Sequence, residues 1–119
     1  LLASVNIPEI DVQEFETLLK SEQEFVLLDV REPWELGRAT WADPRLRLAP
    51  LSQLSQQGVS LLPSEAQDQN SKIIVACHHG IRSANVTGWL LQQGWTEVVS
   101  LRGGIDAYAI QIDPTVGKY

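Results

Sequence analysis

Two short runs of apolar residues constrain the fold of this chain more than any other feature of its sequence. Residues 25–30 read Phe-Val-Leu-Leu-Asp-Val, and residues 72–76 read Lys-Ile-Ile-Val-Ala. Short, nearly continuous apolar runs suit the strands of a parallel sheet that is covered on both faces, because neither face of such a strand contacts water. The two runs therefore predict two central strands of a buried sheet.

Segments with helical periodicity alternate with the expected strands. Val12, Phe15, Leu18 and Leu19 recur at helical spacing, and Pro8 is placed where that helix is expected to begin. Alternating strands and helices predict an α/β fold with a mainly parallel sheet, with ligands bound beyond the carboxyl ends of the strands. The expected strands are residues 3–5, 25–30, 46–48, 72–76 and 97–101, and the other expected helices are residues 51–57, closed by Gly58, and 83–93, stopped by Gly94.

The composition fits one compact domain over residues 1–119. A chain that is 44% hydrophobic and 20% charged is typical of globular proteins. The net charge of -6 disfavours nucleic acid as a partner, because phosphate backbones are bound by clusters of lysine and arginine. No apolar window reaches the about 20 residues of a membrane span, so no membrane partner is expected. The single cysteine excludes an intrachain disulfide, and a reducing, cytoplasmic location is predicted.

The single cysteine, Cys77, follows the second apolar run and opens a distinctive segment, Cys-His-His-Gly-Ile-Arg-Ser over residues 77–83. A strand that ends, a tight loop at Gly80 and a helix that begins near Ser83 leave backbone N–H groups without partners around the sulfur. These donors, the helix dipole and Arg82 favour a thiolate over a thiol. A cysteine that only fills a core needs neither the glycine nor the arginine. The pattern therefore indicates a nucleophilic or anion-binding cysteine.

Three motifs in order carry a resemblance to a known family. They are residues 29–35, Asp-Val-Arg-Glu-Pro-Trp-Glu, the loop from Cys77 to Arg82, and residues 101–108, Leu-Arg-Gly-Gly-Ile-Asp-Ala-Tyr. In these motifs the chain resembles the rhodanese family of sulfurtransferases, and residues 113–119 look like the tail of single-domain bacterial rhodaneses. The resemblance implies a rhodanese-like three-layer fold, with a mainly parallel five-stranded sheet flanked by helices.

The resemblance implies a sulfurtransferase of the thiosulfate sulfurtransferase type, which carries sulfane sulfur as a persulfide on Cys77. Thiosulfate or another persulfide is the expected donor, and a thiol, cyanide or a protein is the expected acceptor. No cofactor and no metal are expected, because consecutive residues rarely direct three side chains at one ion. The persulfide is expected to be held by the backbone N–H groups of the active-site loop, which comprises His78, His79, Gly80, Ile81, Arg82 and Ser83.

Two alternative functions stay open at this point. The first is a sulfur-relay or regulatory module that acts on a protein partner, although the retained Cys77 favours activity. The second is a small cysteine-dependent phosphatase or arsenate reductase. Four residues separate Cys77 from Arg82, one fewer than in the C-x5-R phosphatases, and this tighter ring suits a single sulfur atom better than a tetrahedral phosphate.

Asp29, Arg31 and Glu32 are expected to support the loop. The resemblance suggests that Arg82 braces the loop by pairing with Asp29 or Glu32. The alternative for Asp29 and Arg31 is a structural ion pair at the strand end.

The sequence also supports structural predictions for three further features. His78 and His79 are expected to serve mainly as loop spacers, and residues 103–104 to form a tight strand-to-helix turn. Residues 38–45 depart from the rhodanese pattern, since Arg38 stands where the family commonly has histidine. Trp41 in that segment is expected to cover the core, and the segment as a whole is predicted to contribute a partner surface.

Overall fold

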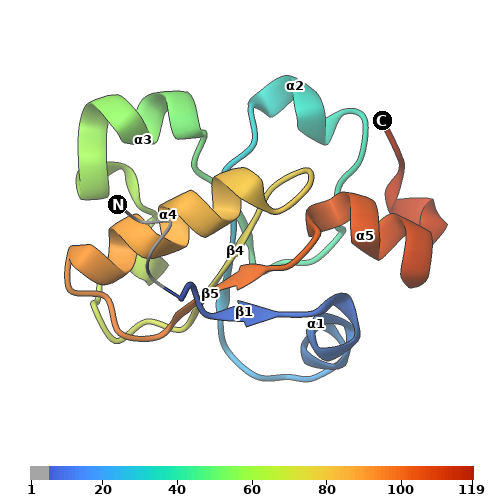
Figure 1. Cartoon of the computed structure of the whole chain (residues 1–119), viewed down its shortest axis with the longest axis horizontal. Helices are drawn as coiled ribbons and strands as arrows, with labels where there is room; N and C mark the ends of the chain where they lie inside the picture. Colours follow the sequence, from blue (N-terminus) through green and yellow to red (C-terminus); the bar gives the residue numbers. More distant parts are fainter. Residues whose placement is uncertain (1–5) are drawn as a thin grey trace.

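The computed structural model describes residues 6–119, whose strands form one fully parallel sheet in the order β1-β5-β4-β2-β3 (Figure 1). The apolar strands β2 and β4 are inner strands, as predicted, and they pair with Asp29 opposite Ala76. This register brings the carboxyl ends of both strands to the same edge of the sheet. The strands are β1 Glu9–Ile10, β2 Val26–Asp29, β3 Leu46–Leu48, β4 Ile73–Ala76 and β5 Val98–Leu101.

Helices cover both faces of the sheet, which confirms the predicted three-layer α/β fold. α3 has the bounds that the sequence predicts, and it ends at Gly58, whose positive φ of 65° closes the helix. The α-helices are α1 Val12–Leu19, α2 Pro33–Leu36, α3 Leu51–Gln57, α4 Ile81–Gln92 and α5 Gly104–Gln111, and the 3₁₀-helices are η2 Gly58–Leu61, η3 Ser64–Ala66 and η4 Pro114–Val116.

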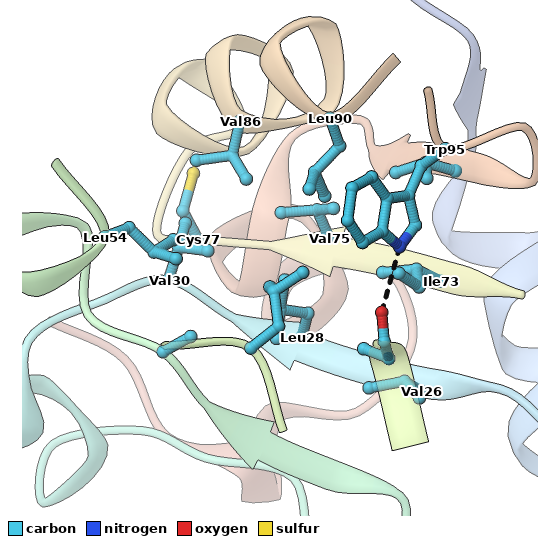
Figure 2. Close-up of a cluster of buried hydrophobic side chains, with 14 residues drawn as sticks. Val26, Leu28, Val30, Leu54, Ile73, Val75, Cys77, Val86, Leu90 and Trp95 are labelled. Carbon is cyan, nitrogen blue, oxygen red and sulfur yellow. Dashed lines mark hydrogen bonds between the residues drawn. The ribbon is translucent and has the colours of Figure 1, made fainter. Parts of the chain in front are cut away.

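The alternating side chains of the central strands build two separate cores. On one face, Val26, Leu28, Ile73 and Val75 pack with residues of α3 and α4, and Trp95 donates its Nε1–H to the Ala66 carbonyl at 2.9 Å (Figure 2). On the other face, strand residues pack with α1 and α5 around a cluster that includes Phe15, Leu27, Trp41, Ile74 and Tyr108. The strands read as almost wholly apolar because each face is buried.

Trp41 belongs to the second core, as predicted. It is 4% exposed, and its ring meets those of Phe15 and Tyr108 edge-on at centroid distances of 5.4 and 5.8 Å. Edge-to-face contacts of this kind add to the stabilisation that area burial gives. The unusual segment between α2 and β3 is therefore anchored by a buried aromatic side chain.

Two predicted helix starts differ from the structure, and one predicted strand is not tested by it. The first helix does not begin at Pro8: it begins at Val12, because the Asp11 carboxylate caps it and Glu14 completes the capping box. The predicted strand 3–5 lies outside the described residues; the first strand that the structure describes is the edge strand β1. α4 begins at Ile81, ahead of the predicted start. Among residues 6–119, no helix is both long enough and apolar enough to span a bilayer.

Candidate active site

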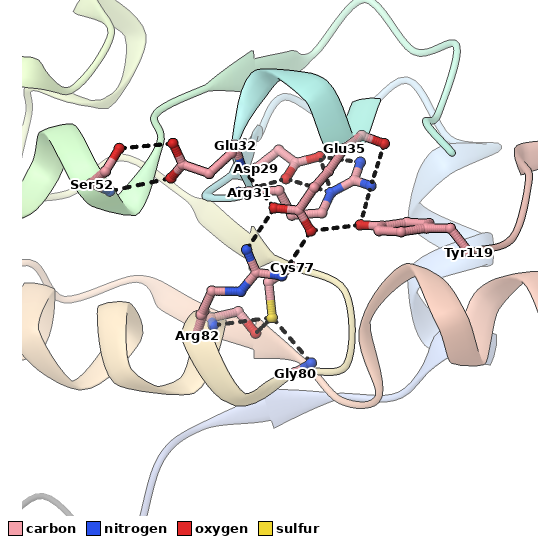
Figure 3. A network of polar contacts seen from close by, with 10 residues as sticks. Asp29, Arg31, Glu32, Glu35, Ser52, Cys77, Gly80, Arg82 and Tyr119 are labelled. Carbon is pink, nitrogen blue, oxygen red and sulfur yellow. Dashed lines mark hydrogen bonds and ion pairs between the residues drawn. The ribbon is translucent and has the colours of Figure 1, made fainter. Parts of the chain in front are cut away.

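Cys77 directly follows β4 at the carboxyl edge of the sheet and is 1% exposed. Its Sγ accepts hydrogen bonds from the backbone N–H groups of Gly80 at 3.1 Å and Ser83 at 3.3 Å (Figure 3). The Ser83 hydroxyl lies 3.5 Å from Sγ and 2.8 Å from the Ser100 hydroxyl on β5. Within residues 6–119, the other predicted loop amides, those of His78, His79, Ile81 and Arg82, make no hydrogen bond to Sγ.

The backbone of the loop is held against the start of α5. The N–H groups of Ile105 and Asp106 donate to the carbonyls of Cys77 and His78, each at 3.0 Å. A Cβ on Gly104 would lie 2.4 Å from the His78 oxygen, so glycine permits this approach. The Gly-Gly turn therefore packs against the active-site loop, and the prediction of a strand-to-helix turn at 103–104 is confirmed.

Gly80 makes the loop turn into α4. It is the N-cap of α4 with φ of 95°, in the left-handed region that side chains disfavour. A Cβ at this position would lie 2.9 Å from the backbone nitrogen of Gly103. The turn aims the Gly80 N–H at the sulfur, and the first turn of α4 brings the Ser83 N–H to the same atom.

Arg82 pairs with Glu35, so the prediction of Asp29 or Glu32 as its partner is wrong. The guanidinium donates from Nη1 to Oε2 at 2.8 Å and from Nη2 to Oε1 at 3.0 Å, a bidentate arrangement (Figure 3). Glu35 lies on the one-turn helix α2, which directs its side chain at the loop, and it is 4% exposed. Arg82 therefore holds the active-site loop in place from outside the group of donors that surrounds the Cys77 sulfur.

The Glu35 carboxylate is held ionised by several donors. The hydrogen bonds from Arg82 lower its pKa to about 2, and the Glu32 N–H at 2.9 Å and the Tyr119 hydroxyl at 2.9 Å act in the same direction. Burial of the carboxylate raises its pKa, but the hydrogen bonds outweigh this effect. The same contacts raise the pKa of Arg82 above its ordinary value. The pair is therefore fully charged at neutral pH.

Asp29 and Arg31 form a buried structural ion pair. Both side chains are fully buried, and Arg31 Nη2 lies 2.7 Å from Asp29 Oδ2 while Arg31 Nε donates to the same carboxylate. Arg31 Nη1 also donates to the Tyr119 hydroxyl at 2.9 Å. Glu32 is turned away from the loop and accepts hydrogen bonds from the hydroxyl and N–H of Ser52 at the start of α3. These three residues support the site indirectly.

The imidazole rings of His78 and His79 lie against each other at a tilt of 30°. Their centroids are 3.9 Å apart, and the His78 ring stacks on Tyr119 at 3.7 Å with an interplanar angle of 5°. Burial lowers the pKa of His78, and the neighbouring His79 adds to this effect. Neither imidazole makes a hydrogen bond to Cys77 among the residues described.

Asp106 joins the two histidines in a cluster whose ligand atoms all lie within 4.8 Å of one another. No sequence pattern linked Asp106 to the two histidines. The two imidazole planes meet at 30°. His79 Nδ1 and Asp106 Oδ2 are 3.7 Å apart. The absence of a metal stays a prediction.

Sequence reasoning missed three residues of the site: Glu35, Tyr119 and Ser100. For Glu35 a signal existed, because Glu32-Pro33-Trp34-Glu35 has a glutamate at the third position of a helix that starts with proline. Tyr119 and Ser100 reach the site from distant parts of the chain, and no local pattern marks them.

This arrangement allows the Cys77 sulfur to act as a nucleophile without a general base. The two amide donors at Sγ stabilise negative charge on the sulfur, and the braced loop keeps them in place. The site therefore supports nucleophilic attack by Cys77.

Comparisons with known proteins agree with this chemistry. The family model for the rhodanese-like domain matches residues 11–111. A sulfurtransferase of Allochromatium vinosum is 29% identical over 103 residues, covering 87% of this chain and 89% of that protein. The rhodanese-like/PpiC domain-containing protein 12 of Arabidopsis thaliana is 30% identical over 116 residues, which are 95% of this chain but 38% of that protein. The thiosulfate sulfurtransferase GlpE of Haemophilus influenzae is 43% identical over 54 residues, 43% of this chain and 51% of that protein.

Solved structures show the same fold. A rhodanese-related protein from Thermoplasma volcanium superposes with a TM-score of 0.70 at 28% identity, covering 88% of this chain and 93% of that one. A thiosulfate sulfurtransferase from Pseudomonas aeruginosa gives a TM-score of 0.73 at 28% identity, covering 91% of this chain and 20% of that one.

Proposed function

Because the chain belongs to the rhodanese-like domain family, we propose that it is a sulfurtransferase that carries sulfane sulfur as a persulfide on Cys77. The observation that carries this proposal is the pair of backbone N–H groups, from Gly80 and Ser83, directed at a buried sulfur. The sulfurtransferases among its relatives support the same class of reaction.

The first half-reaction loads the cysteine. The Cys77 thiolate attacks the outer sulfur of thiosulfate or of another persulfide, and a new S–S bond forms as the old one breaks. With thiosulfate, sulfite leaves with the electron pair, and the product is the Cys77 persulfide anion. No proton has to move in this step, in keeping with a site where neither imidazole contacts the sulfur.

The second half-reaction removes the outer sulfur atom from Cys77. A thiolate, cyanide or a protein nucleophile attacks the outer sulfur, the S–S bond breaks, and the electron pair returns to Cys77. The amide donors of Gly80 and Ser83 stabilise the departing thiolate as they stabilised the attacking one. We propose the cytoplasm as the location, because free thiols are kept reduced there.

The position of Arg82 argues against a phosphatase or arsenate reductase. Both of its terminal nitrogens are bonded to Glu35, so the guanidinium is not free to bind a tetrahedral oxyanion above the sulfur. The short loop leads to the same conclusion. Phosphate-ester hydrolysis is therefore expected to be absent.

Intact-protein mass spectrometry tests the proposal. The protein and its Cys77→Ser variant are incubated with thiosulfate and, separately, with sodium polysulfide, and each sample is then treated with cyanide. The expected result is a gain of one sulfur mass on the unmodified protein only, removed by cyanide with release of thiocyanate. Loading by polysulfide but not thiosulfate assigns a persulfide donor. No loading from either donor overturns the proposal.

A further inference from the structure

Two exposed basic residues lie side by side where the C-terminal segment meets the end of α2. Ala39 and Gly117 form an isolated antiparallel bridge, and the Thr40 N–H donates to the Val116 carbonyl at 2.9 Å. In an antiparallel bridge the residue before one partner lies across from the residue after the other. These neighbours are Arg38 and Lys118, and both are exposed.

The charges of Arg38 and Lys118 are not compensated within the described chain. Of the nine lysines and arginines, six form ion pairs, and among residues 6–119 no carboxylate pairs with the remaining three, Arg38, Lys72 and Lys118. Two of these three are neighbours across one bridge in a protein whose net charge is -6. Like charges placed opposite each other are destabilising, so an anion that docks between them gains from both.

Nearby carboxylates are engaged elsewhere. Glu35 holds Arg82 and accepts from the Tyr119 hydroxyl, and Asp113 accepts from the N–H and hydroxyl of Thr115. The charge of Arg82 is therefore matched inside the site. Arg38 and Lys118 therefore supply the long-range attraction for an anion that approaches this edge of the molecule.

The two cations are connected to the active-site loop by a short path. Lys118 precedes Tyr119, whose ring stacks on His78 at 3.7 Å, and His78 follows Cys77. Figure 3 shows Tyr119 reaching toward the carboxylate of Glu35 that Arg82 holds beside Cys77. In Figure 1 the C-terminus lies beside α2, which carries Trp34.

An exposed tryptophan completes the surface. Trp34 is 64% exposed, and its ring meets that of Tyr119 edge-on at 6.3 Å. Tryptophan and arginine are enriched among the residues that dominate protein–protein binding. An exposed indole beside two unpaired cations fits a protein segment with acidic and apolar residues better than it fits a small thiol.

We infer that Trp34, Arg38 and Lys118 form a docking patch for an acidic segment of the protein that exchanges sulfur with Cys77. The inference rests on the proposed function, because the patch matters for sulfur transfer only if Cys77 carries a persulfide. The cations steer and orient the acidic segment, and Trp34 supplies apolar contact area. The acceptor or donor cysteine is thereby presented to the loop at Cys77.

A series of acceptor peptides tests the inference. The peptides share one cysteine and differ only in the flanking residues, which are aspartates, asparagines or lysines, and 2-mercaptoethanol serves as the uncharged small acceptor. Transfer from the persulfide-loaded protein is followed by mass spectrometry, and each rate is divided by that protein's own rate with 2-mercaptoethanol. We expect the aspartate peptide to exceed the asparagine peptide by about tenfold at low salt, and the difference to shrink at high salt.

Variants separate the docking patch from general electrostatics. The double variant R38Q/K118Q is expected to bring the ratio of aspartate to asparagine peptides close to one. Lys72→Gln is the matched control, because Lys72 is also exposed and without an ion-pair partner among residues 6–119, but it precedes β4, at the opposite end of the strand from Cys77. Equal rates for all three peptides, or an equal loss of preference in K72Q, would overturn the inference.

A binding measurement keeps this test independent of sulfur chemistry. Fluorescein-labelled versions of the peptides, with serine in place of cysteine, are titrated against the unloaded protein and followed by anisotropy. Tighter binding of the aspartate peptide, weakened in R38Q/K118Q and in Trp34→Ala, supports the patch even if no persulfide forms. Normal loading and normal transfer to 2-mercaptoethanol, without any preference among the peptides, would contradict the docking patch and leave the sulfurtransferase proposal intact.

Discussion

The guanidinium of Arg82 and the carboxylate of Glu35 are joined by two hydrogen bonds of 2.8 and 3.0 Å. This contact ties the first turn of α4 to α2, and so fixes one wall of the loop that surrounds Cys77. A carboxylate held in this way has consequences for stability that can be measured separately from activity.

Replacing Glu35 with glutamine should destabilise the protein by about 2 kcal/mol, because Arg82 loses its charged partner in a partly buried site. Urea unfolding followed by tryptophan fluorescence measures the change. Glu65→Gln is the matched control: Glu65 also pairs with an arginine, Arg47, but that pair is exposed and screened by water, so its loss should change stability much less. Equal effects of the two substitutions would contradict the bracing role.

The same carboxylate predicts how stability depends on pH. The pKa of Glu35 is lowered from 4.5 to about 2 in the folded protein, so its contribution is complete above pH 4.5. As pH falls from 4.5 toward 2, the unfolded state takes up the proton first, and the contribution is lost. The stability difference between the unmodified protein and E35Q should therefore narrow across this range. A difference that stays constant down to pH 2 would show that the carboxylate charge is not responsible.

Removing the hydroxyl of Tyr119 should cost about 1 to 2 kcal/mol, because the hydroxyl accepts from Arg31 and donates to Glu35. Tyr119→Phe keeps the ring that stacks on His78, so persulfide loading should persist. Tyr119→Ala removes the stack as well and should slow loading. Thermal unfolding and mass spectrometry record the two effects.

Tyr108→Phe is the control for Tyr119. The Tyr108 ring is buried in the second core, but within residues 6–119 its hydroxyl has no hydrogen-bond partner. Its removal should leave both stability and loading nearly unchanged. A loss in Y108F that matched the loss in Y119F would mean that the Arg31 and Glu35 contacts are not the cause.

Gly80→Ala should abolish persulfide loading and destabilise the protein by more than the about 1 to 2 kcal/mol of a left-handed alanine, because its Cβ would lie 2.9 Å from the Gly103 nitrogen. Gly58→Ala provides the comparison, since Gly58 also has a positive φ but a Cβ there meets nothing within 4 Å. G58A should lose only the stability that corresponds to its strained backbone conformation, and its Cys77 should load sulfur normally. Full loading by G80A would show that the loop tolerates a different path.

The parts of the fold that the sequence predicted are those set by local pattern. The runs at 25–30 and 72–76 became β2 and β4 because their apolar side chains face one core or the other. The short helix 51–57 was predictable because a glycine closes it. The start of α1 was misplaced because Pro8 was preferred to Asp11, although the capping box with Glu14 is the stronger signal.

The site was predictable at its centre and less so at its supports. Cys77 and its loop form one continuous segment, so the position of the loop between β4 and α4 could be predicted from sequence. The partner of Arg82 could not, because three carboxylates, Asp29, Glu32 and Glu35, lie close together in the chain, and only the direction of each side chain decides among them. Glu35 points at the loop, Asp29 is taken by Arg31, and Glu32 turns to Ser52.

The hydrogen bonds from Ile105 and Asp106 to the carbonyls of Cys77 and His78 make the sulfur site sensitive to the length of a distant turn. The peptide planes of the loop cannot flip without breaking these bonds. An insertion or deletion between β5 and α5 would therefore be transmitted to the sulfur, whereas one between η3 and β4, which is remote from these bonds, would be tolerated. A change of length before β4 is thus expected to leave the sulfur site intact, whereas a change of length after β5 is expected to disturb it.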